Sequence, residues 1–309
     1  MRVALALASL VAFTASGCDI GKITVNTTSK VLERGQPSLQ QEADYEMARQ
    51  AIPGALKTVE SFWIVDPDNE RLTKILTEGY CQYGTAFVED DWEAAKFKKD
   101  LEAIDYNNTR ANHIFTRCLN FALKTLGSRW QKELFADSQD TVNKLIKDTG
   151  SGKRFPLLFA GAALGSLINH NLTRIEMIAY LPTVEAILDR VVEIDQKNGP
   201  PKNRAHAALP YIALGMIHTA RGKALGGDPD KGRAMFEMAL KVTDNKFLLA
   251  RTLMAYRVGL ATNDRKFFHE QLKQVLETNP AVWPEQRLAN EVAHRKARRY
   301  LSHEKDLFQ

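Results

Sequence analysis

The spacing of hydrophobic residues along the chain predicts a protein built from α-helices. Beyond residue 39, apolar residues recur every three or four positions, and the strict alternation expected of strands is almost absent. One predicted helix face follows Pro182, a residue suited to a first helical turn, and consists of Val184, Ile187, Leu188, Val191 and Ile194. Turn signals such as Asn198-Gly199-Pro200-Pro201 and Asn279-Pro280 separate such segments. We therefore predict an all-α fold of about a dozen helices, most of them roughly 10–20 residues long.

Part of the chain has the spacing of tetratricopeptide (TPR) repeats, in which small residues let two helices pack closely. The first helix of a repeat is matched by Tyr211, Leu214, Gly215 and His218. The second is matched by Gly232, Phe236 and Ala239, and extra residues fall in the turn at Gly226-Gly227-Asp228-Pro229. A further unit spans residues 248–280. We predict TPR-like helical hairpins stacked as in an α-solenoid over residues 39–309, and a generic helical bundle with chance matches is the alternative.

The first residues of the chain have the layout of a secretory signal. Arg2 precedes an apolar run that ends at Phe13, and small residues follow up to Gly17. The stretch Ala15-Ser16-Gly17-Cys18 resembles a bacterial lipobox, although leucine is more usual at the position of Ala15. We interpret residues 1–17 as a lipoprotein signal peptide, Cys18 as the lipidated residue, and residues 18–38 as including a polar tether. A cleaved signal with an unmodified Cys18 is the alternative, and the membrane leaflet stays open.

Composition and charge exclude several classes of protein. The chain carries 42 Lys and Arg against 37 Asp and Glu, and this mild excess is far from the dense basic face of a nucleic-acid-binding protein. No segment after the signal approaches the roughly 18 apolar residues of a spanning helix. Three cysteines are too few for a disulfide scaffold. Cys81 and Cys118 can pair in an oxidising compartment or stay as two buried thiols, and the sequence alone favours the thiols.

An ordered set of short motifs resembles the T component of TRAP transporters, the tripartite ATP-independent transport systems. The motifs include Asp66-Pro67-Asp68-Asn69, Gly79-Tyr80, Leu181-Pro182, Gly226-Gly227-Asp228-Pro229 and Arg287-Leu288-Ala289-Asn290. The resemblance implies a periplasmic lipoprotein of TPR-like helices that forms homotrimers. It also implies partnership with a solute-binding P component, and a pore or cleft that passes small, apolar ligands.

The sequence contains no arrangement of residues that indicates catalysis. The seven histidines form no pair four residues apart, and neither a nucleophile elbow nor a zinc-protease motif is present. We expect no enzyme activity, no metal and no cofactor. Two rival interpretations remain, a TPR lipoprotein that scaffolds envelope assembly and a helical enzyme that acts on the cell wall.

Candidate ligand-path residues lie in two segments. Tyr80, Tyr83 and Phe87 share one face of a predicted helix, and they line either an apolar path or, as the sequence favours, the core. A helix rich in small residues contains Phe159, Gly161 and Gly165, which provide either room for a passage or, again favoured, close helix packing.

The C-terminal segment is rich in arginine. Arg295, Arg298 and Arg299 are candidates for a surface that binds an acidic partner or anionic lipid. The alternative, which the pattern favours, is a solvated helix face.

Overall fold

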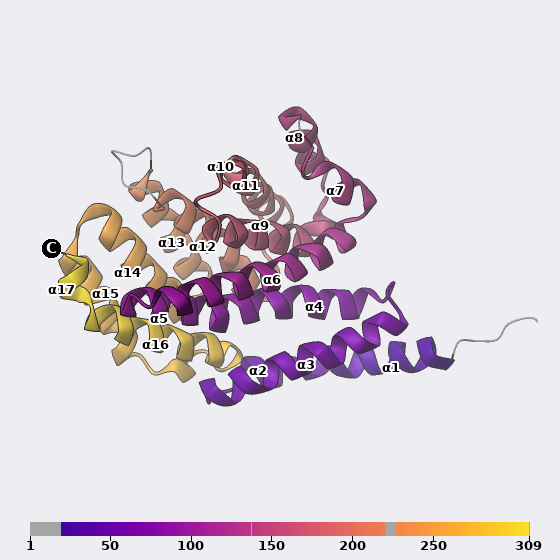
Figure 1. Cartoon of the computed structure of the whole chain (residues 1–309), viewed down its shortest axis with the longest axis horizontal. Helices are drawn as coiled ribbons and strands as arrows, with labels where there is room; N and C mark the ends of the chain where they lie inside the picture. The colour runs from indigo at the N-terminus through magenta and orange to yellow at the C-terminus, as the bar shows by residue number, and fades with distance from the viewer. Residues whose placement is uncertain (1–19, 137, 221–226, 309) are drawn as a thin grey trace, which may run out of the picture.

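The computed structural model describes residues 20–136, 138–220 and 227–308 (Figure 1). Every regular element in these residues is helical, which confirms the all-α prediction. The predicted signal peptide and Cys18 lie outside the described residues, so the interpretation of that segment as a lipid anchor stays a prediction.

The helices follow one another with short connections. The first half contains α1 (Ile20–Gly35), α2 (Pro37–Gln40), α3 (Tyr45–Val65), α4 (Glu70–Tyr83), α5 (Glu89–Lys98), α6 (Leu101–Leu126), α7 (Ser128–Glu133) and α8 (Gln139–Lys147). The second half contains α9 (Arg154–Asn169), α10 (Ile175–Ile178), α11 (Leu181–Asn198), α12 (Arg204–His218), α13 (Pro229–Val242), α14 (Leu248–Thr262), α15 (Arg265–Glu277), α16 (Arg287–Ser302) and α17 (Glu304–Leu307). Four short helical segments complete the set: the π-helical Gly84–Val88 and the 3₁₀ turns Ser151–Lys153, Pro280–Val282 and Pro284–Gln286.

Polar side chains at helix N-termini fix where many of the helices begin. Asp44 accepts hydrogen bonds from the backbone N–H groups of Glu46 and Met47, and it starts α3. The same role is played at other helices by Asn69, Asp100, Ser138, Asn203, Asp228 and Asp264. Each such cap stabilises its helix by about 1 kcal/mol, because it satisfies a donor that the helix itself leaves unpaired.

Helices that are neighbours in sequence pack as antiparallel pairs, and the predicted TPR-like pair is α12 with α13. A side chain at Gly215 would place its Cβ 2.8 Å from the ring of Phe236, and one at Gly232 would lie 3.1 Å from the carbonyl oxygen of Gly215. The following unit pairs α14 with α15, where Gly259 gives space to Phe268. Of the turn predicted to hold extra residues, Gly226 lies outside the described residues.

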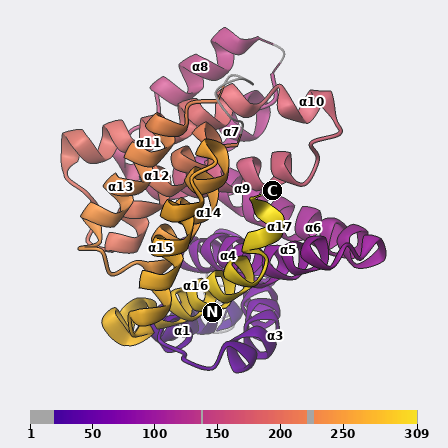
Figure 2. The same ribbon diagram turned by 90° about the vertical axis from the view of Figure 1, so that its left-hand side faces the viewer.

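The last long helix returns to the beginning of the chain. Helix α16 packs on α2 and α3 and is hydrogen-bonded to α5, so the array of pairs closes on itself (Figure 2). In Figure 1 the yellow α16 lies beside the indigo and purple N-terminal helices. An open solenoid would leave the two ends apart, whereas here about two hundred residues of sequence separate helices that touch.

The segment predicted as a polar tether is helical from Ile20 onward. In α1, Val25 and Ser29 are buried, and the helix packs on α3 and α4. Arg71 of α4 pairs with Glu33 of α1, with 3.3 Å between Nε and Oε2. The tether prediction is therefore wrong for this part of the chain. The many threonines and other polar residues of this segment resemble a linker, because a helix with so narrow a buried face needs few apolar residues.

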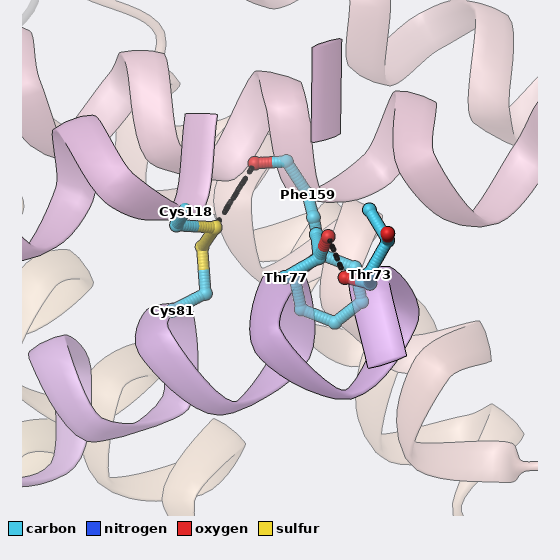
Figure 3. Close-up of a disulfide and its surroundings, with 5 residues drawn as sticks. All are labelled: Thr73, Thr77, Cys81, Cys118 and Phe159. Carbon is cyan, nitrogen blue, oxygen red and sulfur yellow. Dashed lines mark hydrogen bonds between the residues drawn. A yellow bond between two sulfur atoms is a disulfide. The ribbon is translucent and has the colours of Figure 1, made fainter. Parts of the chain in front are cut away.

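Cys81 of α4 and Cys118 of α6 form a disulfide, with their Cα atoms 5.4 Å apart (Figure 3). The expectation of two free thiols is therefore wrong. Both residues are buried, and both sulfur atoms lie 3.9 Å from the carbonyl oxygen of Phe159 in α9. The sequence places these cysteines on separate helices, and only the packing of α4 against α6 brings them within bonding distance.

Candidate functional site

The predicted ligand-path residues of the first segment are part of the hydrophobic core. Tyr80, Tyr83 and Phe87 are all buried. The hydroxyl of Tyr80 donates to Glu60 at 2.8 Å, and its ring stacks on Phe121 with centroids 6.0 Å apart. Burial and the neighbouring Glu60 carboxylate raise the pKa of Tyr80 to about 12, so the hydroxyl stays protonated. These side chains hold α3, α4 and α6 together, in line with the core interpretation.

The predicted ligand-path residues of α9 mediate close packing. A Cβ at Gly161 would lie 2.8 Å from Ile187, and one at Gly165 would lie 3.4 Å from Val184, so both glycines bring α9 against α11. Phe159 is buried beside the disulfide. None of the six predicted residues lines either of the two concavities described below.

A cluster of charges around the buried Asp90 and Lys296 joins α5 to α16, and we call Asp90, Glu93, Arg295, Lys296 and Arg299 the closure cluster. Asp90 has no exposed side-chain surface, and its Oδ2 accepts from Nε of Arg295 at 2.7 Å. Glu93 Oε2 accepts from Lys296 and from Arg299, each at 2.8 Å. The cluster satisfies both carboxylates from the opposite end of the sequence, so it locks the closed arrangement.

The charges of the closure cluster set the ionisation of its carboxylates. Burial alone would raise the pKa of Asp90, but the positive charges of Lys296 and Arg299, together with hydrogen bonds from Arg295 and Arg299, lower it below its ordinary value. Glu93 behaves in the same way, and it accepts a further hydrogen bond from the hydroxyl of Tyr300 at 2.6 Å. Both groups are therefore ionised at neutral pH.

The closure cluster changes the interpretation of the predicted basic surface. Arg295 and Arg299 both bind the chain's own carboxylates. Arg299 is largely buried and pairs with Asp90 and Glu93, whereas Arg295 pairs with Asp90 and keeps 43% of its side-chain surface exposed. Arg298 is exposed on the same helix. Sequence reasoning missed Asp90 and Glu93 as partners of the basic residues on α16. The sequence does contain an acidic run near Asp90 and a basic run near Arg295, but the two runs are about two hundred residues apart and no local pattern connects them.

A cleft of about 370 Å³ lies where α10, α11, α12 and the start of α13 meet, and we call it the His218 cleft. Its apolar wall is formed by Ile178, Ala179, Leu181, Pro182 and Ile217. Its polar wall is formed by Glu185, His218, Gly227 and Asp228. The cleft combines an apolar wall with a few converging polar groups, as binding clefts commonly do.

His218 is the unusual group in this cleft. The residue is buried, and among the described residues its Nε2 has no hydrogen-bond partner. Glu185 Oε1 is 3.6 Å away, too far for a hydrogen bond, and the same atom is 3.3 Å from Nζ of Lys231. Burial and the charge of Lys231 lower the pKa of His218, so the ring is neutral at pH 7. A buried polar atom without a partner is costly, and a ligand or partner group entering the cleft can satisfy it.

Exposed apolar side chains lie on and near α10, the helix that contributes Ile178 to the cleft. Ile175 is 82% exposed, and Leu172, just before α10, is also exposed. The ring of Phe135, itself exposed, makes an edge contact with Tyr180, which leads into α11. Exposed apolar residues close together in sequence are typical of a surface that receives another protein.

A second concavity, of about 470 Å³, lies between α1 and the start of α4. It is lined by Asn26, Glu33, Asp66, Asp68, Asn69, Glu70, Arg71 and Lys74. All of these side chains are polar, and several pair with one another or cap α4, so the concavity offers little apolar surface to a ligand.

Within the described residues, none of the helices has both the length and the apolar character required to cross a bilayer.

A model of the TRAP transporter T-component family matches residues 41–308. The chain belongs to this family. The match covers α3 to α17 and thus both the closure cluster and the His218 cleft. The chain is also similar to a protein of Treponema pallidum (strain Nichols) described as uncharacterized, with 21% identity over 280 residues, 87% of this chain and 81% of the relative. The family identifies this chain as a component of a TRAP transporter.

Proposed function

We propose that this T component is a lipid-anchored periplasmic subunit that recruits the solute-binding P component of its transport system. The observation that carries the proposal is the family match over residues 41–308. A subunit of this kind acts by binding, and the proposal assigns it no catalysis. The rival role as a scaffold for envelope assembly would require different partners on the same fold.

Two features of the chain support the compartment and the anchor. The stretch Ala15-Ser16-Gly17-Cys18 ends an apolar run and provides a site for lipid attachment at Cys18. The disulfide between Cys81 and Cys118 favours an oxidising compartment such as the periplasm, because cytoplasmic thiols are kept reduced. Both point to an envelope protein whose body lies outside the cytoplasm.

We place the docking surface for the P component at the His218 cleft. Two of the family-like motifs, which are 45 residues apart in sequence, meet there: Leu181-Pro182 supplies the apolar wall, and Gly227-Asp228 supplies part of the polar wall. Ile175 on α10 and Leu172 just before it add exposed apolar side chains in the segment that leads to Ile178. A partner side chain that hydrogen-bonds His218 would remove the cost of its unpaired nitrogen.

Photo-cross-linking tests this assignment. A photoreactive amino acid replaces Ile178 at the cleft, and a matched variant carries it at the exposed Lys266 of α15. Both variants are expressed in the native envelope, and cross-linked proteins are identified by mass. We expect a TRAP solute-binding protein on Ile178 and a much weaker product on Lys266. Equal cross-linking at both positions, or a product at Lys266 alone, would contradict docking at the cleft.

The family resemblance also implies a homotrimer, which we include in the proposal. Light scattering of the purified protein should then give three times the mass of one mature chain. We do not extend the proposal to ligand passage through the protomer, because all six residues expected to line a path serve helix packing.

A further inference from the structure

We propose that the outer face of α1 lies against the phospholipid surface of the membrane and fixes how the protein body is oriented on it. This inference uses the proposed lipidation of Cys18 only to place the start of α1 near the bilayer. Helix α1 begins at Ile20, two residues after Cys18. Two residues span at most about 7 Å, so a lipidated Cys18 would hold the start of α1 at the bilayer surface.

The outer face of α1 is apolar and basic. Ile20, Ile23 and Val31 are 78%, 55% and 67% exposed, and their spacing places them on the side opposite the buried Val25 and Ser29. Among the described helices, α1 and α3 each carry three exposed large apolar side chains, more than any other helix. A soluble helix with such a face is normally covered by something.

The charges on α1 favour phospholipid as the cover. Lys30 and Arg34 are exposed on the same side as Ile23, while the acidic Glu33 is turned toward α4 and pairs with Arg71. Basic residues interleaved with isoleucine and valine match the interface of an anionic bilayer, where the apolar groups enter the headgroup region and the cations meet phosphate. A second protein would require its own acidic, apolar surface, and the short distance to the anchor argues for lipid.

This contact would orient the functional surface. Helix α10, which borders the His218 cleft, lies on the opposite side of the molecule from α1 in both Figure 1 and Figure 2. With α1 on the bilayer, the cleft would face away from it toward the periplasm, where a solute-binding protein arrives. A lipid anchor alone allows the body to tumble, whereas a second contact along the helix removes that freedom.

Fluorescence quenching tests the contact directly. Thr27 lies between Ile23 and Val31 on the exposed face, and in the lipidated protein a Thr27→Cys thiol is free while Cys81 and Cys118 are paired. The mature lipoprotein, labelled there with an environment-sensitive dye, is reconstituted into vesicles of phosphatidylethanolamine and phosphatidylglycerol. The matched control carries the dye on Ile175→Cys of α10, which is also highly exposed.

We expect brominated lipid to quench the dye at residue 27 at least twofold more than the dye at 175, and iodide to quench it several-fold less. Equal quenching at the two positions would overturn the inference. A dye at 27 that is protected from iodide and untouched by brominated lipid would also overturn it, because another protein chain would then cover α1.

A second measurement separates this inference from the proposed anchor. Incorporation of a labelled fatty acid into the wild-type chain in its native cells reports on lipidation of Cys18 alone. In the mature chain, residues 18–309, carrying Cys18→Ser, vesicle binding reports on α1, and we expect Ile20→Ser with Ile23→Ser to weaken it roughly tenfold. The matched change Ile175→Ser should leave it unaltered. Vesicle binding that is the same in all three chains would overturn the inference while leaving the anchor intact.

Discussion

Removing the disulfide between Cys81 and Cys118 should lower stability by an amount that its position in the chain determines. The bond closes a loop of 37 residues between α4 and α6. The loss of loop-closure entropy in the unfolded state gives about 3.8 kcal/mol for this length. With an unfolding entropy of about 2.1 cal/mol/K per residue, this corresponds to a Tm lower by roughly 6 °C in a chain of this size.

Thermal unfolding with and without reductant measures this effect. We expect the wild-type protein to lose the full amount on reduction, and the Cys81→Ser/Cys118→Ser variant to melt at the temperature of the reduced wild type. The serine hydroxyls lie near the carbonyl oxygen of Phe159, which can accept a hydrogen bond, so the substitutions add little cost of their own. Reductant should leave the Tm of the variant unchanged.

Two results would refute the reasoning. Titration of the unfolded, unreduced protein should find both cysteines unreactive, and reactive thiols at these positions would show that the bond does not form. A reductant-dependent drop of equal size in the double variant would show that the effect arises elsewhere. The first result would also remove one of the two supports for a periplasmic location.

The remaining predictions concern packing and the closure cluster. Asp90→Asn should cost about 3–5 kcal/mol in urea unfolding, because it strands buried cations, whereas Arg298→Met on the exposed side should change stability by less than about 0.5 kcal/mol. Folding lowers the pKa of Asp90, so the contribution of its ionised form to the free energy of unfolding is complete above about pH 4 and is lost as the pH falls through the pKa of the folded state. Acid unfolding of Asp90→Asn should therefore show less of this loss of stability. An acid transition unchanged from the wild type would contradict the assignment. Gly232→Ala should destabilise by about 1–3 kcal/mol, because the new Cβ would collide with the Thr219 side chain and crowd the carbonyl oxygen of Gly215. Gly54→Ala, with open space around it, should stabilise by about 0.5–1 kcal/mol, and the same sign for both changes would refute the close-packing argument.

Helical periodicity and small residues predicted much of the fold. The spacing of Gly215 and Gly232 is a local property of two helices, and the structure uses both glycines as the pattern indicates. The partners of the acidic run near Asp90 could not be predicted in this way. They lie on α16, and their meeting depends on the accumulated geometry of every helix pair between them.

The errors at the N-terminus and at the cysteines have related physical causes. A helix such as α1 needs only Val25 and Ser29 to be buried, so its hydrophobic signal is too weak to stand out from a polar linker. Cys81 and Cys118 pair because α4 packs on α6, which is a tertiary fact. The His218 cleft is also tertiary, although both motifs that line it were visible in the sequence.

Affinity purification of the full-length protein from its native membranes, with Cys18 intact, tests the central claim most directly. Proteins that co-elute after gentle solubilisation are identified and quantified by mass. The account predicts a TRAP solute-binding protein in an amount comparable to the T component itself. Envelope-assembly proteins in its place, with no solute-binding protein, would contradict the proposed recruitment and support a scaffold role on the same fold.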